Sequence, residues 1–276
     1  MVKVTESVDG KPLKCSITFD GYLKKNLDDQ HTYRINNFDV VGMITGEEGA
    51  GKTTIAMQIA YYMDSNFSND HIVFNAEGFE RAINNLPKGS VILWDEADDV
   101  GSNWASEMMV VLKKTFKRIR KNNFVILLVT PTYHDLNKYF AIHRTRFLID
   151  VHSDFVTRGR FRFFNRAGKR LLYIYGKKEM NMRAAKASFY GTFTDYPKGF
   201  PIDFERYEKE KDKATEETME KVVTPKNLRK DFLLSLVAYF DREKIPYTQK
   251  DLGDIIGVDR STISKYLKEY GGVSAF

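Results

Sequence analysis

The chain has 276 residues, of which 42% are hydrophobic and 29% charged, and its formal net charge is +6. This composition excludes a disordered or collagen-like chain, and no apolar run is long enough to cross a membrane. The single cysteine, Cys15, excludes an internal disulfide and a cysteine-based zinc site. We therefore expect a cytoplasmic protein with one sizeable α/β domain, a smaller domain, and a polyanionic partner that matches the basic charge.

The first predicted elements lead to a glycine-rich loop. Residues 1–37 read as an irregular or β-rich lead-in with turn signals at 9–12 and 20–21. Residues 38–45 are mostly apolar, as in a buried parallel strand, and residues 54–63 form a helix-compatible run without proline or glycine. Between them lies Gly46-Glu47-Glu48-Gly49-Ala50-Gly51-Lys52-Thr53, which matches the phosphate-binding pattern G-x-x-x-x-G-K-[ST].

The loop predicts a site for ATP and Mg²⁺. Glycines allow backbone N–H groups to turn toward phosphates, and the start of the following helix adds a partial positive charge. Lys52 would reach the β and γ phosphates, and the Thr53 hydroxyl would ligate Mg²⁺. The expected nucleotide-binding residues are Gly46, Glu48, Gly49, Ala50, Gly51, Lys52, Thr53 and Thr54.

A second signature follows a short strand at 71–75 and a helix at 77–86. Four apolar residues, 91–94, are followed by Asp95 and Glu96, which places two carboxylates at the end of a strand. Asp95 would hold Mg²⁺ through a water molecule, and Glu96 would orient and activate the attacking water. A surface acidic turn is the alternative interpretation, and Glu107 is a secondary candidate for the base.

The next elements are a helix at 103–122, a strand at 124–130 and a strand at 147–151. Thr130 ends its strand, where its hydroxyl could contact the γ-phosphate or the lytic water, although a threonine that only leads into Pro131 fits equally well. Arg144 and Arg146 could reach the nucleotide of a neighbouring subunit, or they could be solvated surface residues. The alternation of strands and helices predicts a parallel sheet covered by helices on both faces.

Residues 155–178 alternate basic and aromatic side chains, which we interpret as a β-hairpin appended to the core. Arginines at alternate positions would face DNA while the aromatic rings pack inward, and Arg158, Arg160 and Arg162 are the candidates. Inward packing of the rings under a basic strand face explains the same pattern without DNA. Residues 1–204 would form this first domain, and the charged segment 205–227 would be the linker.

Residues 228–276 predict a small helical domain whose segment 247–267 resembles a helix-turn-helix unit that binds DNA. Thr248 would cap one helix, Leu252 and Ile255 would face inward, and Gly257 would make the turn. The candidates for DNA contact are Arg260, Ser261, Thr262, Ser264 and Lys265. A helical domain that contacts protein remains the alternative, because the charges of these helices nearly balance.

From about residue 38 to residue 151, the order of loop, acidic strand, Thr130 strand and arginine-bearing tail resembles P-loop ATPases of the additional-strand class. The resemblance is to the FtsK/HerA type in particular, to which viral DNA-packaging ATPases and related plasmid or archaeal ATPases are close. Residues 88–97 also resemble the acidic motif of zonula-occludens-toxin-like phage assembly ATPases. The resemblance implies a RecA-like core, ATP and Mg²⁺, and a homo-oligomer such as a hexameric ring. Thr130 stands where FtsK/HerA-type motors often have glutamine.

These features lead to the hypothesis of a DNA-dependent ATPase that moves or remodels duplex DNA in the cytoplasm, including the host cytoplasm if a virus or plasmid encodes it. One alternative is an AAA+ replication initiator or helicase loader, which would need a helical lid with a phosphate-contacting arginine after the core. The other is a regulator whose DNA affinity is switched by ATP without motor activity. Sustained phosphate release distinguishes a motor from such a switch.

Overall fold

The computed structural model describes residues 1–38, 40–95, 115, 118–134, 136, 138–153, 158–221 and 225–269. The chain divides into two compact units, Met1–Thr215 and Glu216–Phe276. Within these described ranges, we find no helix with the length and apolar character that a membrane span requires.

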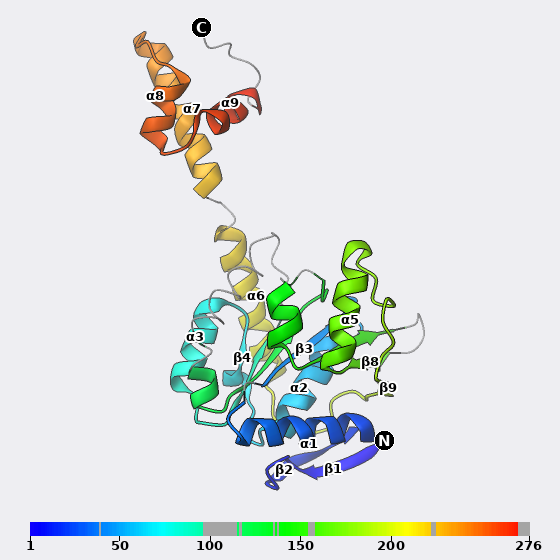
Figure 1. The fold of residues 1–276 in the computed structure, drawn as a ribbon. Helices are drawn as coiled ribbons and strands as arrows, with labels where there is room; N and C mark the ends of the chain where they lie inside the picture. The colour runs from blue at the N-terminus through cyan, green and yellow to red at the C-terminus, as the bar shows by residue number, and fades with distance from the viewer. Residues whose placement is uncertain are drawn as a thin grey trace. The chain divides into compact units, whose positions relative to one another are not determined.

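The first unit is built on a sheet of seven described strands (Figure 1). Their order across the sheet is β4 (Ile72–Val73), β5 (Val91–Trp94), β6 (Val125–Val129), β3 (Val40–Gly46), β7 (Phe147–His152), β8 (Arg160–Phe164) and β9 (Phe189–Thr192). The strands from β4 to β7 are parallel, whereas β8 and β9 are added antiparallel. The predicted α/β class with a mostly parallel sheet is confirmed.

Helices cover both faces of this sheet. Successive side chains of each strand point to opposite faces, and both sets are apolar, so each face is buried under helices. Val40 and Ile44 of β3 pack on the face that carries α1 (Gly21–Ile35) and α2 (Lys52–Met63). Val41 and Met43 pack on the other face, together with α3 (Ala76–Asn85), η2 (Phe140–Arg144) and α5 (Arg166–Gly176). Burial on both sides explains why these strands read as continuous apolar runs.

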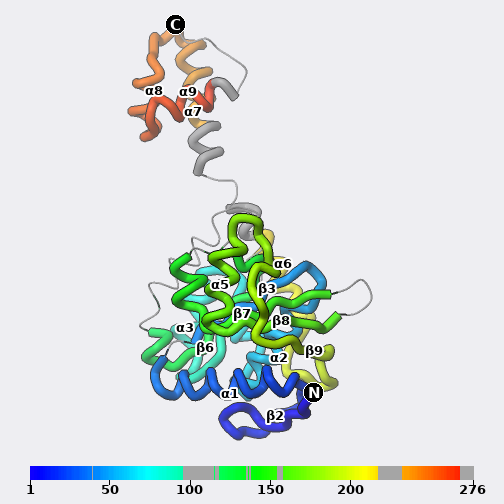
Figure 2. The backbone as a smooth tube through the Cα atoms, turned by 45° about the vertical axis from the view of Figure 1, so that its right-hand side comes forward, coloured from blue at the N-terminus to red at the C-terminus, as the bar shows by residue number. Residues whose placement is uncertain are grey.

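The N-terminal segment is β-rich only in its first half. The strands β1 (Val2–Glu6) and β2 (Pro12–Phe19) form an antiparallel hairpin, beside which α1 lies (Figure 2). Asp20 begins α1, because its carboxylate accepts hydrogen bonds from the amides of Tyr22 and Leu23 at 2.9 and 3.2 Å. The description of residues 1–37 as a β-rich lead-in therefore missed a helix, whose polar sequence gives only a weak apolar pattern.

The basic-aromatic segment needs a correction. Residues 160–164 form strand β8, but the second strand of the predicted hairpin is wrong, because residues 171–175 belong to α5. Asn165 caps α5 by accepting a hydrogen bond from the Gly168 amide at 2.9 Å, and Leu172 and Tyr173 pack against the core. The strand that pairs with β8 is β9, which follows the short η3 (Lys177–Glu179).

The described residues of the second compact unit lie in helices and the short turns between them. The helix α6 (Phe204–Lys221) includes the division at Thr215, and α7 (Pro225–Glu243), α8 (Gln249–Ile256) and α9 (Arg260–Glu269) follow it. Thr248 and Asp251 form a capping box at the start of α8, and Gly257 ends this helix with a φ of 72°. Leu252 is buried as expected, but Ile255 is 52% exposed, so the prediction that Ile255 faces inward is wrong.

Candidate active site

The glycine loop follows β3 and leads directly into α2. Gly46, Gly49 and Gly51 have φ angles of 142°, 70° and 98°, in the region that glycine tolerates best. A Cβ atom on Gly46 would lie 2.0 Å from the carbonyl oxygen of Val151, so this position has no room for a side chain. The loop therefore has the backbone shape of a phosphate-binding turn.

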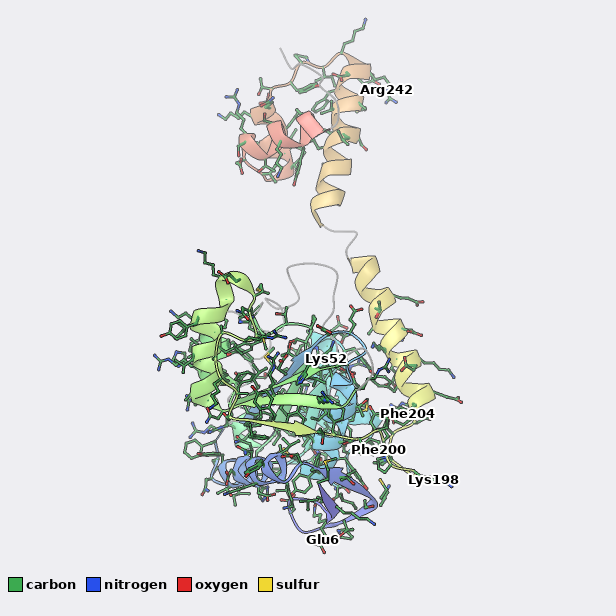
Figure 3. The ribbon with its side chains drawn as sticks, turned by 90° about the vertical axis from the view of Figure 1, so that its right-hand side faces the viewer. Glu6, Lys52, Lys198, Phe200, Phe204 and Arg242 are labelled. Atoms are coloured by element: carbon green, nitrogen blue, oxygen red, sulfur yellow. The ribbon has the colours of Figure 1, made fainter. Side chains whose placement is uncertain are left out.

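Lys52 is the first residue of α2 and is only 4% exposed. Figure 3 labels this lysine within the first unit. Its Nζ donates hydrogen bonds to the carbonyl oxygens of Gly46 and Glu47, at 2.9 and 3.3 Å. Glu48 is exposed and Ala50 is buried. Because the first turn of a helix leaves its amides without intrahelical acceptors, the ammonium group and the start of α2 together favour an anion at this loop.

Asp95 follows β5 directly and is fully buried. The Thr53 hydroxyl donates to its Oδ1 at 3.1 Å, so the structure brings together the two residues that the sequence analysis assigned to Mg²⁺. Adjacent ligands of an octahedral Mg²⁺ lie about 2.9 Å apart, given its usual Mg–O distances. A hydroxyl and a carboxylate oxygen at this spacing fit a magnesium ion that shares its remaining positions with phosphate and water.

Two further candidates, Glu96 and Thr130, were expected beside the phosphate site. Glu96 lies outside the described residues. Thr130 follows β6, which lies between β3 and β5, and it is fully buried at the same edge of the sheet as Gly46 and Asp95. Its amide donates to Ile44 and its hydroxyl donates to the Thr132 carbonyl at 3.2 Å, so the hydroxyl proton points into its own turn.

Arg144 and Arg146 lie at the opposite edge of the sheet. The Arg146 amide donates to the Val41 carbonyl, and Val41 precedes Gly46 by five residues, or about 16 Å of strand. The Arg146 guanidinium lies over the Tyr33 ring at 4.0 Å, and that of Arg144 lies over Tyr139. These arginines are therefore not part of the phosphate site of their own chain.

The three arginines around β8 differ from one another. Arg158 and Arg160 are exposed, whereas Arg162 pairs with the buried Asp150, its Nε donating to Oδ2 at 2.7 Å. Burial raises the pKa of Asp150, and the Arg162 guanidinium opposes this shift. The assignment of Arg162 as a DNA contact therefore needs correction, because its charge serves a carboxylate within the sheet.

On α9 the candidate side chains also differ. Arg260, Ser261 and Lys265 are exposed, and Thr262 and Ser264 are half-buried. The hydroxyls of Ser261 and Thr262 donate to Asp259, and these bonds hold the pKa of that carboxyl at about 2. Both hydroxyls thus serve the start of α9.

Sequence reasoning missed two tyrosines beside the site. Tyr207 on α6 donates its phenolic proton to Asp95 Oδ2 at 2.6 Å. The Tyr196 hydroxyl donates to the sulfur of Met57 on α2 at 3.3 Å, and burial raises the pKa of Tyr196. No local pattern marks either residue, because each contacts a partner more than a hundred residues earlier in the chain.

The glycine loop, the buried lysine and the strand-end aspartate at one edge of a parallel sheet define the fold. The chain has a P-loop NTPase fold. No protein-family model matches it, and neither does any curated protein sequence.

Solved structures resemble it only in general arrangement. The N-terminal domain of zonular occludens toxin from Neisseria meningitidis is 14% identical with a TM-score of 0.36, and the match covers 58% of this chain and 96% of that domain. A Thermotoga maritima RuvB variant is 16% identical with a TM-score of 0.35, over 96% of this chain and 90% of that one. At such scores the similarity identifies neither a family nor a function, so the fold assignment rests on the geometry above.

Proposed function

We propose that this protein is a Mg²⁺-dependent ATPase that couples hydrolysis to the movement or remodelling of duplex DNA. The observation that carries the proposal is the 3.1 Å contact between Thr53 and Asp95 beside the buried Lys52. Three chemically different groups, an ammonium, a hydroxyl and a carboxylate, meet at the end of the loop. Such a set suits a phosphate chain and its metal ion better than any uncharged ligand.

The roles of the residues follow from their chemistry. Lys52 exchanges the carbonyls of Gly46 and Glu47 for phosphate oxygens, while the amides of the loop bind the same anion. Thr53 and Asp95 would hold Mg²⁺, which would supply positive charge beside the phosphates. Glu96 would orient the attacking water, and the Thr130 hydroxyl oxygen would accept a hydrogen bond from that water.

The position of β6 supports a place among the additional-strand ATPases of the FtsK/HerA type. This strand separates β3, which precedes the loop, from β5, which delivers Asp95. Because Arg144 and Arg146 lie at the other end of the parallel strands, a contribution of either one to catalysis requires a second subunit. We therefore propose a homo-oligomer, such as a hexameric ring, in which one of them faces the neighbouring nucleotide.

DNA as the partner is supported by exposed basic groups in both compact units. Arg158 and Arg160 lie at the start of β8, and Arg260 and Lys265 lie on α9. Exposed guanidinium and ammonium groups bind phosphates, and a helix such as α9 after a short turn suits the major groove. We propose that α8 and α9 act as a DNA-binding helix-turn-helix.

The test is phosphate release over many turnovers by the full-length protein, with and without duplex DNA. We expect Mg²⁺-dependent hydrolysis that DNA stimulates, and a loss of at least about a hundredfold in Lys52→Ala. Lys198→Ala is the matched control, because Lys198 is exposed, and it should retain the normal rate.

The outcomes separate the alternatives. Normal hydrolysis by Lys52→Ala would refute the assigned site. An equal rate of phosphate release with and without duplex DNA would show that the protein is an ATPase but would refute the proposed coupling to DNA. Tight ATP binding with a single turnover would instead indicate an ATP-switched regulator.

A further inference from the structure

Tyr207 links the metal-binding carboxylate to a helix outside the nucleotide motifs. Its phenolic oxygen lies 2.6 Å from Asp95 Oδ2, while Thr53 lies 3.1 Å from Oδ1 of the same carboxylate. Tyr207 is 5% exposed and Asp95 is fully buried. Each oxygen of the carboxylate therefore has a donor from a different helix, Thr53 from α2 and Tyr207 from α6.

The position of Tyr207 is itself fixed by contacts at the start of α6. Its ring packs against Phe74 at 5.6 Å between centroids, and its amide donates to the Asp203 carbonyl at 3.0 Å. The side-chain amide of Asn69 forms two hydrogen bonds with the backbone of Asp203. It donates to the Asp203 carbonyl at 2.8 Å and accepts from the Asp203 amide at 2.9 Å. The phenolic oxygen is thus held by a rigid part of the first unit.

This arrangement selects one orientation of Asp95. The terminal torsion of a carboxylate is broad, and the bond from Tyr207 restricts the rotation of Asp95 about it. The bond from Tyr207 keeps Oδ2 turned toward α6, so that Oδ1 stays at the Thr53 hydroxyl, where Mg²⁺ is expected. Partners that orient a metal ligand in this way typically change metal affinity by 10- to 100-fold when they are removed.

We propose that Tyr207 is a positioning residue for Mg²⁺ at Asp95 and that it attaches α6 to the nucleotide site. The proposal rests on the proposed function, since it requires Mg²⁺ with a nucleotide at Thr53 and Asp95. It adds a residue that lies outside the loop and the acidic strand and that acts through Asp95 without touching the phosphates.

The test compares full-length wild type with Tyr207→Phe, which removes the hydroxyl and keeps the ring. Binding of a fluorescent ATP analogue is titrated with Mg²⁺ and, separately, measured in the presence of a chelator. We expect the Mg²⁺ midpoint to rise about tenfold in Tyr207→Phe, with unchanged metal-free binding. The apparent KM for Mg²⁺ in hydrolysis should rise by the same factor, while kcat at saturating Mg²⁺ is retained.

Tyr133→Phe is the matched control. Tyr133 is also a buried tyrosine, but its hydroxyl donates to the carbonyls of Ala141 and Lys169 in the core on the other face of the sheet. It should leave the Mg²⁺ midpoint unchanged. Equal midpoints for wild type and Tyr207→Phe would overturn the positioning role alone, whereas a wild type that binds no nucleotide would overturn the proposed function as well.

Discussion

Lys169 is a fully buried lysine on α5 whose ammonium is held by backbone carbonyl groups. Its Nζ donates to Ala141 at 2.5 Å and to Ile142 at 2.9 Å, near the C-terminal end of η2. Burial, and to a smaller extent the charge of Arg166, lowers the pKa of Lys169 from 10.5 to about 7. A cation at this place costs desolvation energy, which its hydrogen bonds to the Ala141 and Ile142 carbonyls partly offset.

This lysine predicts a pH dependence of stability. Between about pH 7 and 10.5, the unfolded lysine keeps a proton that the folded one has lost, so the free energy of unfolding should rise with pH. Below about pH 7 both states are protonated and the contribution is constant. Thermal unfolding midpoints from about pH 7 to about pH 9.5 should therefore rise in wild type and rise less in Lys169→Met. An equal rise in both proteins would show that Lys169 is not its source.

At the scale of single residues, the sequence predicted the contacts that a contiguous motif encodes. The spacing from Gly46 to Thr53 and the position of Asp95 at a strand end were sufficient to propose Thr53 and Asp95 as metal-binding residues. In the structure their oxygen atoms lie 3.1 Å apart. The bond from Tyr207 to Asp95 spans 112 residues, and it depends on how α6 packs against the sheet. No spacing rule describes such a contact, because tertiary packing alone brings the two residues together.

The strand β8 shows what a sequence pattern can and cannot predict for an element. Alternation placed Phe161 and Phe163 in the core, where they are 0% and 1% exposed. The register then puts Arg162 opposite Asp150 on β7, and this pairing was not visible in the sequence. The helix α5 was misread for a related reason. Its aromatic and branched residues favour strands, but the Asn165 cap and burial of Leu172 outweigh that preference.

The arginines of this segment should separate into structural and DNA-binding groups. Arg162→Ala leaves the buried Asp150 without its partner and should lower the free energy of unfolding by about 3 kcal/mol. Arg158→Ala and Arg160→Ala should change it by less than about 0.5 kcal/mol, because both side chains are exposed. Urea unfolding of the three variants measures the difference.

The same variants test the DNA contact. Arg158→Ala and Arg160→Ala should weaken binding to duplex DNA of any sequence, and each should reduce the slope of log affinity against log salt by about 1. Wild-type affinity and slope in both would exclude this part of β8 as a DNA contact. If Arg158→Ala and Arg160→Ala lost as much stability as Arg162→Ala, these two arginines would belong to the structural group instead.

At the scale of the whole molecule, α6 is the element that both compact units share. It begins at Phe204, contacts Asp95 through Tyr207, and continues past Thr215 to Lys221. Binding linkage is reciprocal: if the Tyr207 contact tightens Mg²⁺ binding by some factor, Mg²⁺ with nucleotide must strengthen that contact by the same factor. The nucleotide site is therefore expected to act on the helix that leads to the second unit.

This reciprocity gives a prediction that hydrogen exchange can measure. Backbone amides of residues 207–215 should exchange up to about tenfold more slowly when a non-hydrolysable ATP analogue and Mg²⁺ are bound, because the opening of α6 must break a strengthened contact. The slowing should disappear in Tyr207→Phe and persist in Tyr133→Phe. Protection of the loop residues would show that the ligand is bound. If the exchange rates of wild-type α6 then stayed unchanged, the helix would be packed against the site without being coupled to it.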